Sequence, residues 1–129
     1  MRTVVCIGII EKGNSVARLA KPKRVIVYAD QKGNEPFTDW LYGLKDSMGR
    51  KRIMLRIKRL EQGNYGDCEP VGEGVNELRL FFGSGYRVYF GEDANNVVVL
   101  LCGGDKGSQK KDIKQAKLYW QEYLNHGKI

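Results

Sequence analysis

Two arginines, Arg79 and Arg87, lie in successive segments of the chain in which apolar and polar residues alternate. Guanidinium groups stay charged at any working pH and match the oxygens of a phosphate in a bidentate way. In the strand pairing that we expect, Tyr89 lies on the same sheet face as the arginines, and Lys106 follows the next apolar segment. These four side chains together predict a site of the size and charge that a phosphate needs.

The spacing of these segments predicts how their side chains face one another. Residues 77–82 and 86–90 both alternate with a period of two, and the Gly-Ser-Gly sequence at 83–85 fits a three-residue hairpin loop. That loop length places Arg79 directly opposite Tyr89, and paired residues share a sheet face. The opposite, core-facing side is predicted to carry Leu78, Leu80, Tyr86, Val88 and Phe90.

Structural roles remain an alternative for each of these features. Arg79 could pair with Glu77 or Glu73, and Arg87 could solvate an exposed sheet face. The glycine-rich sequence 103–108 precedes a predicted helix, as a phosphate-binding loop would, but it lacks the GxxxxGK[ST] spacing of nucleotide hydrolases. A strand-to-helix turn explains its glycines equally well.

A second set of basic residues lies on the predicted helix 47–61. Between Lys45 and Arg59 there are seven basic residues against the single carboxylate of Asp46. Such an excess predicts an electrostatic contact surface for RNA, DNA or an acidic partner, although a solvated helix face is the simpler alternative. The candidate RNA- or ribosome-binding residues are Arg50, Lys51, Arg52, Arg56, Lys58, Arg59, Lys110 and Lys111.

The elements that must position these residues form one α+β pattern. Residues 25–28 favour a strand, and an apolar stripe over 37–44 predicts a helix that Asn34 could cap. The apolar run 97–102 predicts a central strand, and Ser108 could cap a last helix. The order is therefore a strand, two helices, three or four antiparallel strands and a C-terminal helix.

Length and composition fit one domain. The 129 residues carry a net charge of +7, which favours a polyanionic partner. Three cysteines without CxxC spacing argue against a disulfide framework or a zinc site, and the single histidine, His126, argues against a catalytic triad. No apolar run reaches the length of a membrane span. Residues 1–23 fall outside the readable pattern and form an N-terminal extension without an assigned role.

Several short motifs in this order resemble one family of bacterial toxins. They are Phe37-Thr38-Asp39-Trp40-Leu41, residues 59–67, residues 72–79, Gly85-Tyr86-Arg87-Val88-Tyr89-Phe90 and residues 100–106, followed by Gln109, Asp112 and Ile113. As a set they are similar to the addiction-module killer proteins, which are HigB-like toxins of the RelE/ParE superfamily. The resemblance covers about residues 24–120, and it places the toxin domain at 24–129.

The resemblance implies a fold and an activity. The fold is α+β, with two N-terminal helices packed on a small antiparallel sheet and a C-terminal helix. RelE-like members enter the ribosomal A site and cleave mRNA without metal or cofactor, by attack of the ribose 2′-hydroxyl on the adjacent phosphate. A base must take the 2′ proton, cations must hold the pentavalent phosphate, and an acid must protonate the leaving oxygen.

Some catalytic roles transfer to this chain by motif. Arg87 matches the phosphate-stabilising arginine of the superfamily, Arg79 a nearby basic position, and Lys106 a cationic or acidic residue near the C-terminus. Glu69 resembles the carboxylate base of the YoeB-like branch. Tyr89 is an alternative acid that rests on our predicted strand pairing and not on the resemblance.

The chain departs from RelE where protons are transferred. RelE has two lysines before its arginine, where this chain has Val75 and Glu77, and a tyrosine on its last helix where this chain has Ile113. Phosphate binding therefore transfers better than proton transfer.

The resemblance also implies partners and leaves two alternatives. The partners are a helix-turn-helix, HigA-like antitoxin, the ribosome and mRNA, all in the cytoplasm, with no membrane and with an oligomer formed together with the antitoxin. One alternative is a ParE-like toxin that inhibits DNA gyrase and is not a nuclease. The other is a basic nucleic-acid-binding module without activity of its own.

Overall fold

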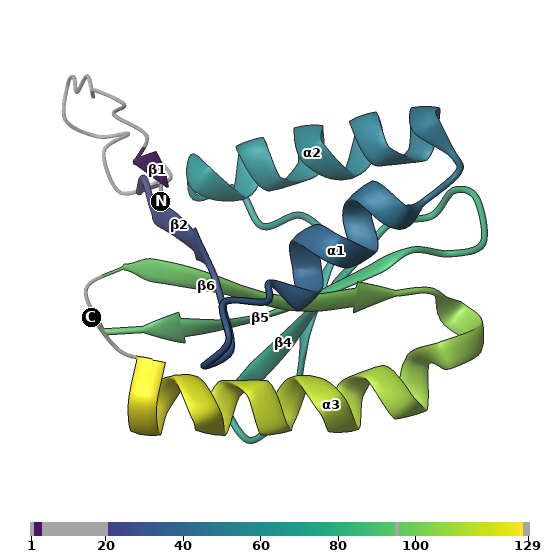
Figure 1. The fold of residues 1–129 in the computed structure, drawn as a ribbon. Helices are drawn as coiled ribbons and strands as arrows, with labels where there is room; N and C mark the ends of the chain where they lie inside the picture. The colour runs from purple at the N-terminus through teal and green to yellow at the C-terminus, as the bar shows by residue number, and fades with distance from the viewer. Residues whose placement is uncertain (1, 4–20, 95, 128–129) are drawn as a thin grey trace, which may run out of the picture.

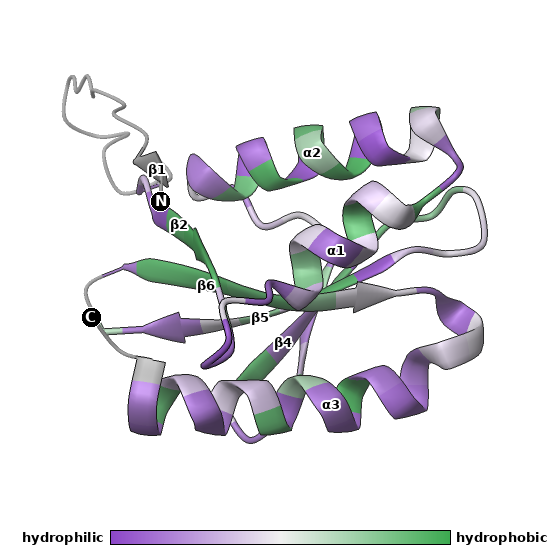
Figure 2. Ribbon diagram, viewed as in Figure 1, coloured by the Kyte–Doolittle hydropathy of each residue, from purple (hydrophilic) through white to green (hydrophobic). Residues whose placement is uncertain are grey.

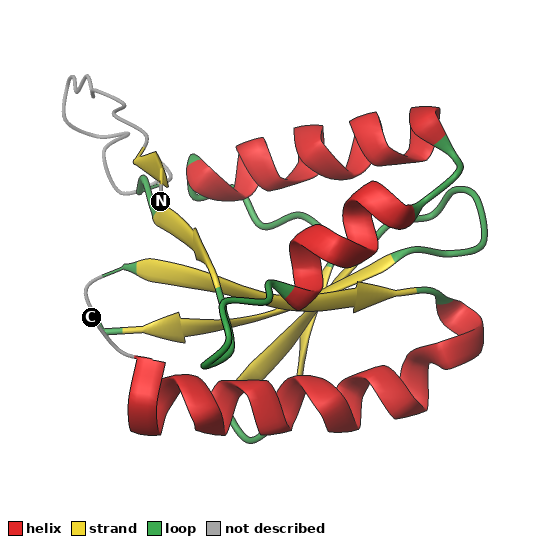
Figure 3. Cartoon of the chain, viewed as in Figure 1, coloured by secondary structure: helices red, strands yellow, loops and turns green. Residues whose placement is uncertain are grey.

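The computed structural model describes residues 2–3, 21–94 and 96–127, and these form an α+β fold (Figure 1; Figure 3). The described strands make one six-stranded sheet in the order β1-β2-β6-β5-β4-β3. The strands are β1 (Arg2–Thr3), β2 (Arg24–Val27), β3 (Cys68–Gly72), β4 (Val75–Arg79), β5 (Arg87–Asp93) and β6 (Val97–Gly104). The helices are α1 (Pro36–Gly43), α2 (Ser47–Glu61) and α3 (Gln109–Glu122), with a 3-10 turn at Lys106–Ser108 and a final π-helical turn at Tyr123–Gly127.

The sheet is mixed, so the expectation of an antiparallel sheet is wrong at one pairing. Strands β3 to β6 are antiparallel to their neighbours, but β2 runs parallel to β6, from Arg24 opposite Val97 to Val27 opposite Leu100. Alternation within a strand fixes which side chains share a face and says nothing about the direction of a strand far away in sequence. The α+β class itself is confirmed.

Helices cover both faces of the sheet. Helices α1 and α2 lie on one side and α3 lies on the other (Figure 1). Green, hydrophobic ribbon marks β6, while α2 and α3 alternate between purple and green because one stripe of each helix faces the sheet (Figure 2). The core under α1 and α2 includes Phe37, Leu41, Ile53, Leu60, Leu78, Val88, Phe90 and Leu100. The core under α3 includes Val75, Tyr89, Val99, Leu101, Ala116, Trp120 and Tyr123.

Two glycines let tryptophan rings lie close against the sheet. A Cβ atom on Gly103 would collide with the ring of Trp40 from α1, and a Cβ atom on Gly91 would collide with the ring of Trp120 from α3. Both helices can therefore approach the sheet backbone closely. The expectation that the tryptophans belong to the core is met by Trp120, which is buried, while Trp40 packs half-buried at the edge of the core.

The hairpin between β4 and β5 has a longer loop than the glycines predicted. Arg79 lies directly opposite Arg87, and Tyr89 lies opposite Glu77, so the predicted pairing of Arg79 with Tyr89 is wrong by two residues. The turn is closed by hydrogen bonds from Leu80 N to Tyr86 O and from Gly85 N to Phe82 O. Because the shift is an even number of residues, the predicted core face is unchanged.

Neither of the two predicted N-caps forms a side-chain cap bond, whereas α2 has a cap that was not predicted. Asp46 caps α2 by accepting a hydrogen bond of 2.9 Å from Gly49 N. Asn34 does not cap α1: Glu35 stands at that position, and the Asn34 side chain binds Asp30 instead. Ser108 stands at the cap position of α3 without a side-chain cap bond, because the capping box belongs to the preceding 3-10 turn.

In the described part of the chain, no helix is both long enough and apolar enough to cross a bilayer. The N-terminal extension predicted at 1–23 lies largely outside the described residues, as does Cys6. The other two cysteines, Cys68 and Cys102, are free thiols.

Candidate functional site

The two arginines of the predicted phosphate site lie side by side on the sheet face that α3 covers. Arg79 on β4 places its Nη2 2.5 Å from Glu69 Oε1 and its Nε 3.5 Å from Glu77 Oε1. Arg87 on β5 places its Nε 3.8 Å from Glu77 Oε2. The strand register is what brings them together, because directly opposed residues of an antiparallel pair project from the same face.

A buried carboxylate, Glu77, is the centre of this cluster. Its side chain is 3% exposed, and besides the two guanidinium groups it accepts hydrogen bonds from the Tyr89 hydroxyl at 3.0 Å and from Gln109 Nε2 at 2.7 Å. Gln109 is the first residue of α3, so this bond also fixes the start of that helix against the sheet. The alternative that Arg79 pairs with Glu77 is confirmed, whereas the pairing with Glu73 is replaced by Glu69, since Glu73 contacts Lys117.

From the sequence, Glu77 was predicted as a possible partner of Arg79 and as a departure from the lysines of RelE, and Gln109 had no predicted role. Alternation does place Glu77 on the same face as Arg79, so a carboxylate beside the two arginines was a usable signal. The helix that buries that face could not be placed by alternation alone.

Tyr89 is fully buried, so the expectation that it emerges beside the arginines is wrong. Its hydroxyl points to Glu77, and its pKa is raised far above the ordinary tyrosine value by burial and by the charge of that carboxylate. The phenol therefore keeps its proton and donates a hydrogen bond to the Glu77 carboxylate. Its role in the cluster is to orient Glu77.

The arginine pair has unused hydrogen-bonding capacity. Among the described residues, the Nε atoms of Arg79 and Arg87 are buried and make no hydrogen bond, because the Glu77 oxygens lie at ion-pair distance without hydrogen-bond geometry. Buried donors without acceptors are uncommon and costly. The Arg87 side chain is 9% exposed and that of Arg79 24% exposed, so an anion would reach the pair chiefly along Arg79.

The two candidate proton carriers lie at opposite margins of this cluster. Glu69, on the edge strand β3, is paired in register with Glu77, and its side chain is 62% exposed. Lys106 is exposed in the 3-10 turn just after β6, two residues beyond Gly104, which pairs with Arg87. Its backbone N–H contacts Ser84 O at 3.4 Å, so it borders the hairpin loop. The turn 103–108 is the strand-to-helix turn of the alternative interpretation, since Asp105 caps it with its own side chain.

The basic residues of α2 do not form one uniform surface. Arg56 is committed to the fold: its guanidinium donates to the backbone oxygens of Tyr65, Asp67 and Arg79 at 3.2, 2.9 and 2.6 Å. Arg50 donates to Leu44 O at 2.9 Å. The remaining members of the predicted set are exposed: Lys51, Arg52, Lys58 and Arg59 on α2, and Lys110 and Lys111 on α3.

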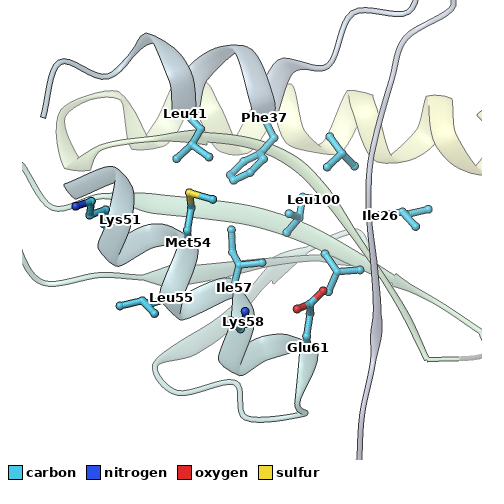
Figure 4. A pocket seen from close by; sticks show the side chains of 12 residues that line it. Ile26, Phe37, Leu41, Lys51, Met54, Leu55, Ile57, Lys58, Glu61 and Leu100 are labelled. Atoms are coloured by element: carbon cyan, nitrogen blue, oxygen red, sulfur yellow. The ribbon is translucent and has the colours of Figure 1, made fainter. Parts of the chain in front are cut away.

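An apolar groove of about 600 Å³ lies between α1, α2 and strands β2 and β6. Figure 4 shows Phe37 and Leu41 of α1 pointing into it from one side and Met54 and Ile57 of α2 from the other. Lys51 and Lys58 stand at the same groove (Figure 4). The groove was not predictable from the sequence, because Met54 lies beside the buried stripe of α2 and its position gives no sign that α1 and the sheet border the same space.

No group of three or more His, Cys, Asp or Glu side chains in the described ranges could hold a metal ion.

The chain is similar to a known protein over most of that protein's length. An uncharacterized protein of Haemophilus influenzae is 52% identical over 86 residues, which are 67% of this chain and 87% of the relative. The chain belongs to the same family as that protein. No protein-family model matches the chain.

Proposed function

We propose that this protein is the toxin of a type II toxin–antitoxin system, a HigB-like member of the RelE/ParE superfamily that cleaves mRNA on the ribosome. The observation that carries the proposal is the pair formed by Arg79 and Arg87, each with a buried Nε that makes no hydrogen bond. The resemblance matches Arg87 to the phosphate-stabilising arginine of the superfamily and Arg79 to a nearby basic position. The α+β fold and the net charge of +7 are consistent with an RNA substrate.

In the proposed reaction, the ribose 2′-oxygen attacks the adjacent phosphorus while the bond from phosphorus to the 5′-oxygen breaks. The products are a 2′,3′-cyclic phosphate and a 5′-hydroxyl. Arg79 and Arg87 stabilise the charge that grows on the phosphate oxygens. Glu69, exposed beside Arg79, takes the 2′ proton, and Lys106 supplies a proton to the leaving oxygen or neutralises its charge.

The proposed antitoxin would bind the apolar groove between α1 and α2. An amphipathic helix with acidic residues fits this surface, because the groove is apolar and carries Lys51 and Lys58. Such a partner would not need to touch the arginine pair on the opposite side of the sheet (Figure 1).

One observation favours a second candidate, the ParE-like toxin that binds its target without cleaving RNA. The carboxylate of Glu77 already lies between the two arginines, and Tyr89 is sealed inside, so the buried part of the cluster holds a counter-ion and no proton donor for a substrate. This candidate predicts growth arrest and DNA damage without new mRNA ends.

The test is induced expression of the protein followed by mapping of mRNA 5′ ends. Wild type should produce new ends within translated codons. Arg87→Ala should lower the cleavage rate by about 10²–10³, the usual cost of removing one donor to a transition state. Lys114→Ala, which removes an exposed cation on α3, is the control and should cleave normally.

Because Arg87 is buried, its truncation could also perturb the fold. Arg87→Lys keeps the charge but cannot bind phosphate in a bidentate way, so it should fold and still lose most of the activity. Undiminished cleavage by a folded Arg87→Lys and Arg87→Ala would refute the proposed mechanism.

A further inference from the structure

A second groove lies on the outer side of α2, where that helix meets the end of β4 and the hairpin loop. Its volume is about 430 Å³, and of its lining residues only Arg79 has a role in the proposed reaction. One wall comes from Arg52, Arg56 and Arg59, which recur at helical spacing along α2, and the other comes from Arg79 and the residues that follow it.

The first notable feature of this groove is Phe81. Its side chain is 75% exposed, the most exposed large apolar side chain in the described part of the chain. The neighbouring residue, Phe82, packs against the core, and the centre of the Phe82 ring lies 5.1 Å from the Arg52 guanidinium. An aromatic ring open to solvent and flanked by cations is the combination that single-stranded nucleic acids bind, by base stacking and by phosphate contacts.

The second feature is that the fold holds Phe81 in place. Arg56 binds the backbone oxygen of Arg79, two residues before Phe81, and the hydrogen bond from Leu80 N to Tyr86 O closes the loop around it. The backbone around Phe81 is therefore held in place, although the phenylalanine ring itself is exposed. Ordering it on binding costs little conformational entropy, because a phenylalanine side chain has few rotamers.

We propose that this groove binds single-stranded RNA, with a base stacked on Phe81 and the backbone phosphates on Arg52 and Arg59. Charge complementarity supports this occupant, since Asp67 alone contributes a carboxylate to the lining. Arg79 lines the groove, where its backbone oxygen accepts a hydrogen bond from Arg56, and its side chain belongs to the arginine pair on the other face of the sheet. The groove and the arginine pair therefore share this one residue. The inference rests on the proposed function only in taking RNA as the ligand.

The test measures fluorescence anisotropy of a labelled single-stranded RNA with the full chain. The RNA carries 2′-O-methyl groups, so that it cannot be cleaved by 2′-hydroxyl attack. Phe81→Ala should weaken binding by roughly 5- to 100-fold, the loss of one base–aromatic stack, and Phe81→Tyr should bind as wild type does. Leu118→Ala is the matched control, because it truncates an equally dispensable exposed side chain, 59% exposed, on α3.

Charge reversal tests the phosphate contacts separately. Replacing Arg52 and Arg59 by glutamate should weaken binding at low salt more than at high salt and should flatten the salt dependence. Arg56 is left intact because it holds the loop in place. Thermal unfolding should be unchanged in Phe81→Ala, whose removed ring is exposed.

Three results would overturn the inference. The first is that Phe81→Ala and wild type bind the RNA with equal affinity, and the second is that Phe81→Ala and Leu118→Ala lose the same amount of RNA affinity. The third is that polyglutamate displaces the RNA equally well from wild type and from Phe81→Ala. The last would make the groove a surface for acidic proteins. RNA binding that depends on Phe81, in a protein that produces no mRNA ends, would refute the proposed nuclease and leave this inference standing. Cleavage that depends on Arg87 and ignores Phe81 would do the reverse.

Discussion

Glu77→Gln should destabilise the protein because it removes the shared counter-ion of the buried Arg87 and the half-buried Arg79. The substitution preserves shape and leaves an oxygen to accept from Tyr89, so its main effect is the loss of one negative charge. At separations of 3.5 and 3.8 Å, each ion pair contributes about 4.5 kcal/mol of attraction at an effective dielectric constant of 20. Desolvation of Glu77 offsets much of this, yet removing one partner of a buried pair still costs about 3–5 kcal/mol.

The assay is thermal unfolding followed by circular dichroism. A loss of about 3 kcal/mol corresponds to a fall in Tm of about 10–15 °C for a domain of this size. Glu73→Gln is the matched control, because Glu73 makes an exposed ion pair with Lys117 and should shift the Tm little. Millimolar inorganic phosphate should raise the Tm of Glu77→Gln more than that of wild type, because the phosphate replaces the missing charge. A variant that melts within about 2 °C of wild type would refute the reasoning.

Three further predictions concern other parts of the molecule. Glu69→Gln should slow cleavage on programmed ribosomes by about 10²–10⁴ without loss of ribosome binding if Glu69 takes the 2′ proton, whereas Glu73→Gln should cleave at the wild-type rate; equal rates would remove Glu69 from the mechanism. Met54→Glu should abolish co-purification with the antitoxin, while Met48→Glu, exposed on the same helix outside the groove, should not; retention by both would place the antitoxin elsewhere. The hydrogen bond from the backbone of α2 lowers the pKa of Asp46 from its usual 3.8, so this carboxylate stabilises the folded state above about pH 4, and the contribution disappears as the pH falls through the lowered pKa. The difference in denaturant midpoint between wild type and Asp46→Ala should therefore be largest near neutral pH and should shrink in acid. A difference that does not depend on pH would contradict the assignment.

Periodicity predicted the elements of the fold well because local patterns determine them. Helix α2 occupies the predicted residues because its apolar stripe determines it locally, and Asp46 at its start and the left-handed Gly63 after its end limit it in the structure. Strand direction and register were less predictable, because they depend on contacts between distant segments. The glycines around Ser84 predicted a three-residue loop, but the loop is longer, because Phe82 packs against the core and the turn is closed at Leu80 and Tyr86.

The candidate site was predictable in its charges and not in its burial. Alternation placed Arg79 and Arg87 on one face, and the structure brings them even closer together than the predicted pairing did. Helix α3 then covers the same face and closes over Tyr89 and Glu77, which no local pattern could show. Phe81 was overlooked for the converse reason, because a residue predicted within a strand lies in a loop and is exposed.

The parallel pairing of β2 with β6 has a consequence for the order in which the chain assembles. About seventy residues separate the two strands, whereas β3, β4, β5 and β6 each pair with a neighbour in sequence. Closing so long a segment costs more entropy than closing a hairpin, so the antiparallel strands should form first and β2 should dock last. During synthesis β2 leaves the ribosome before β6 and cannot pair with it until β6 has been made. The apolar groove, which has β2 as one wall, therefore comes into being only with the final step of folding.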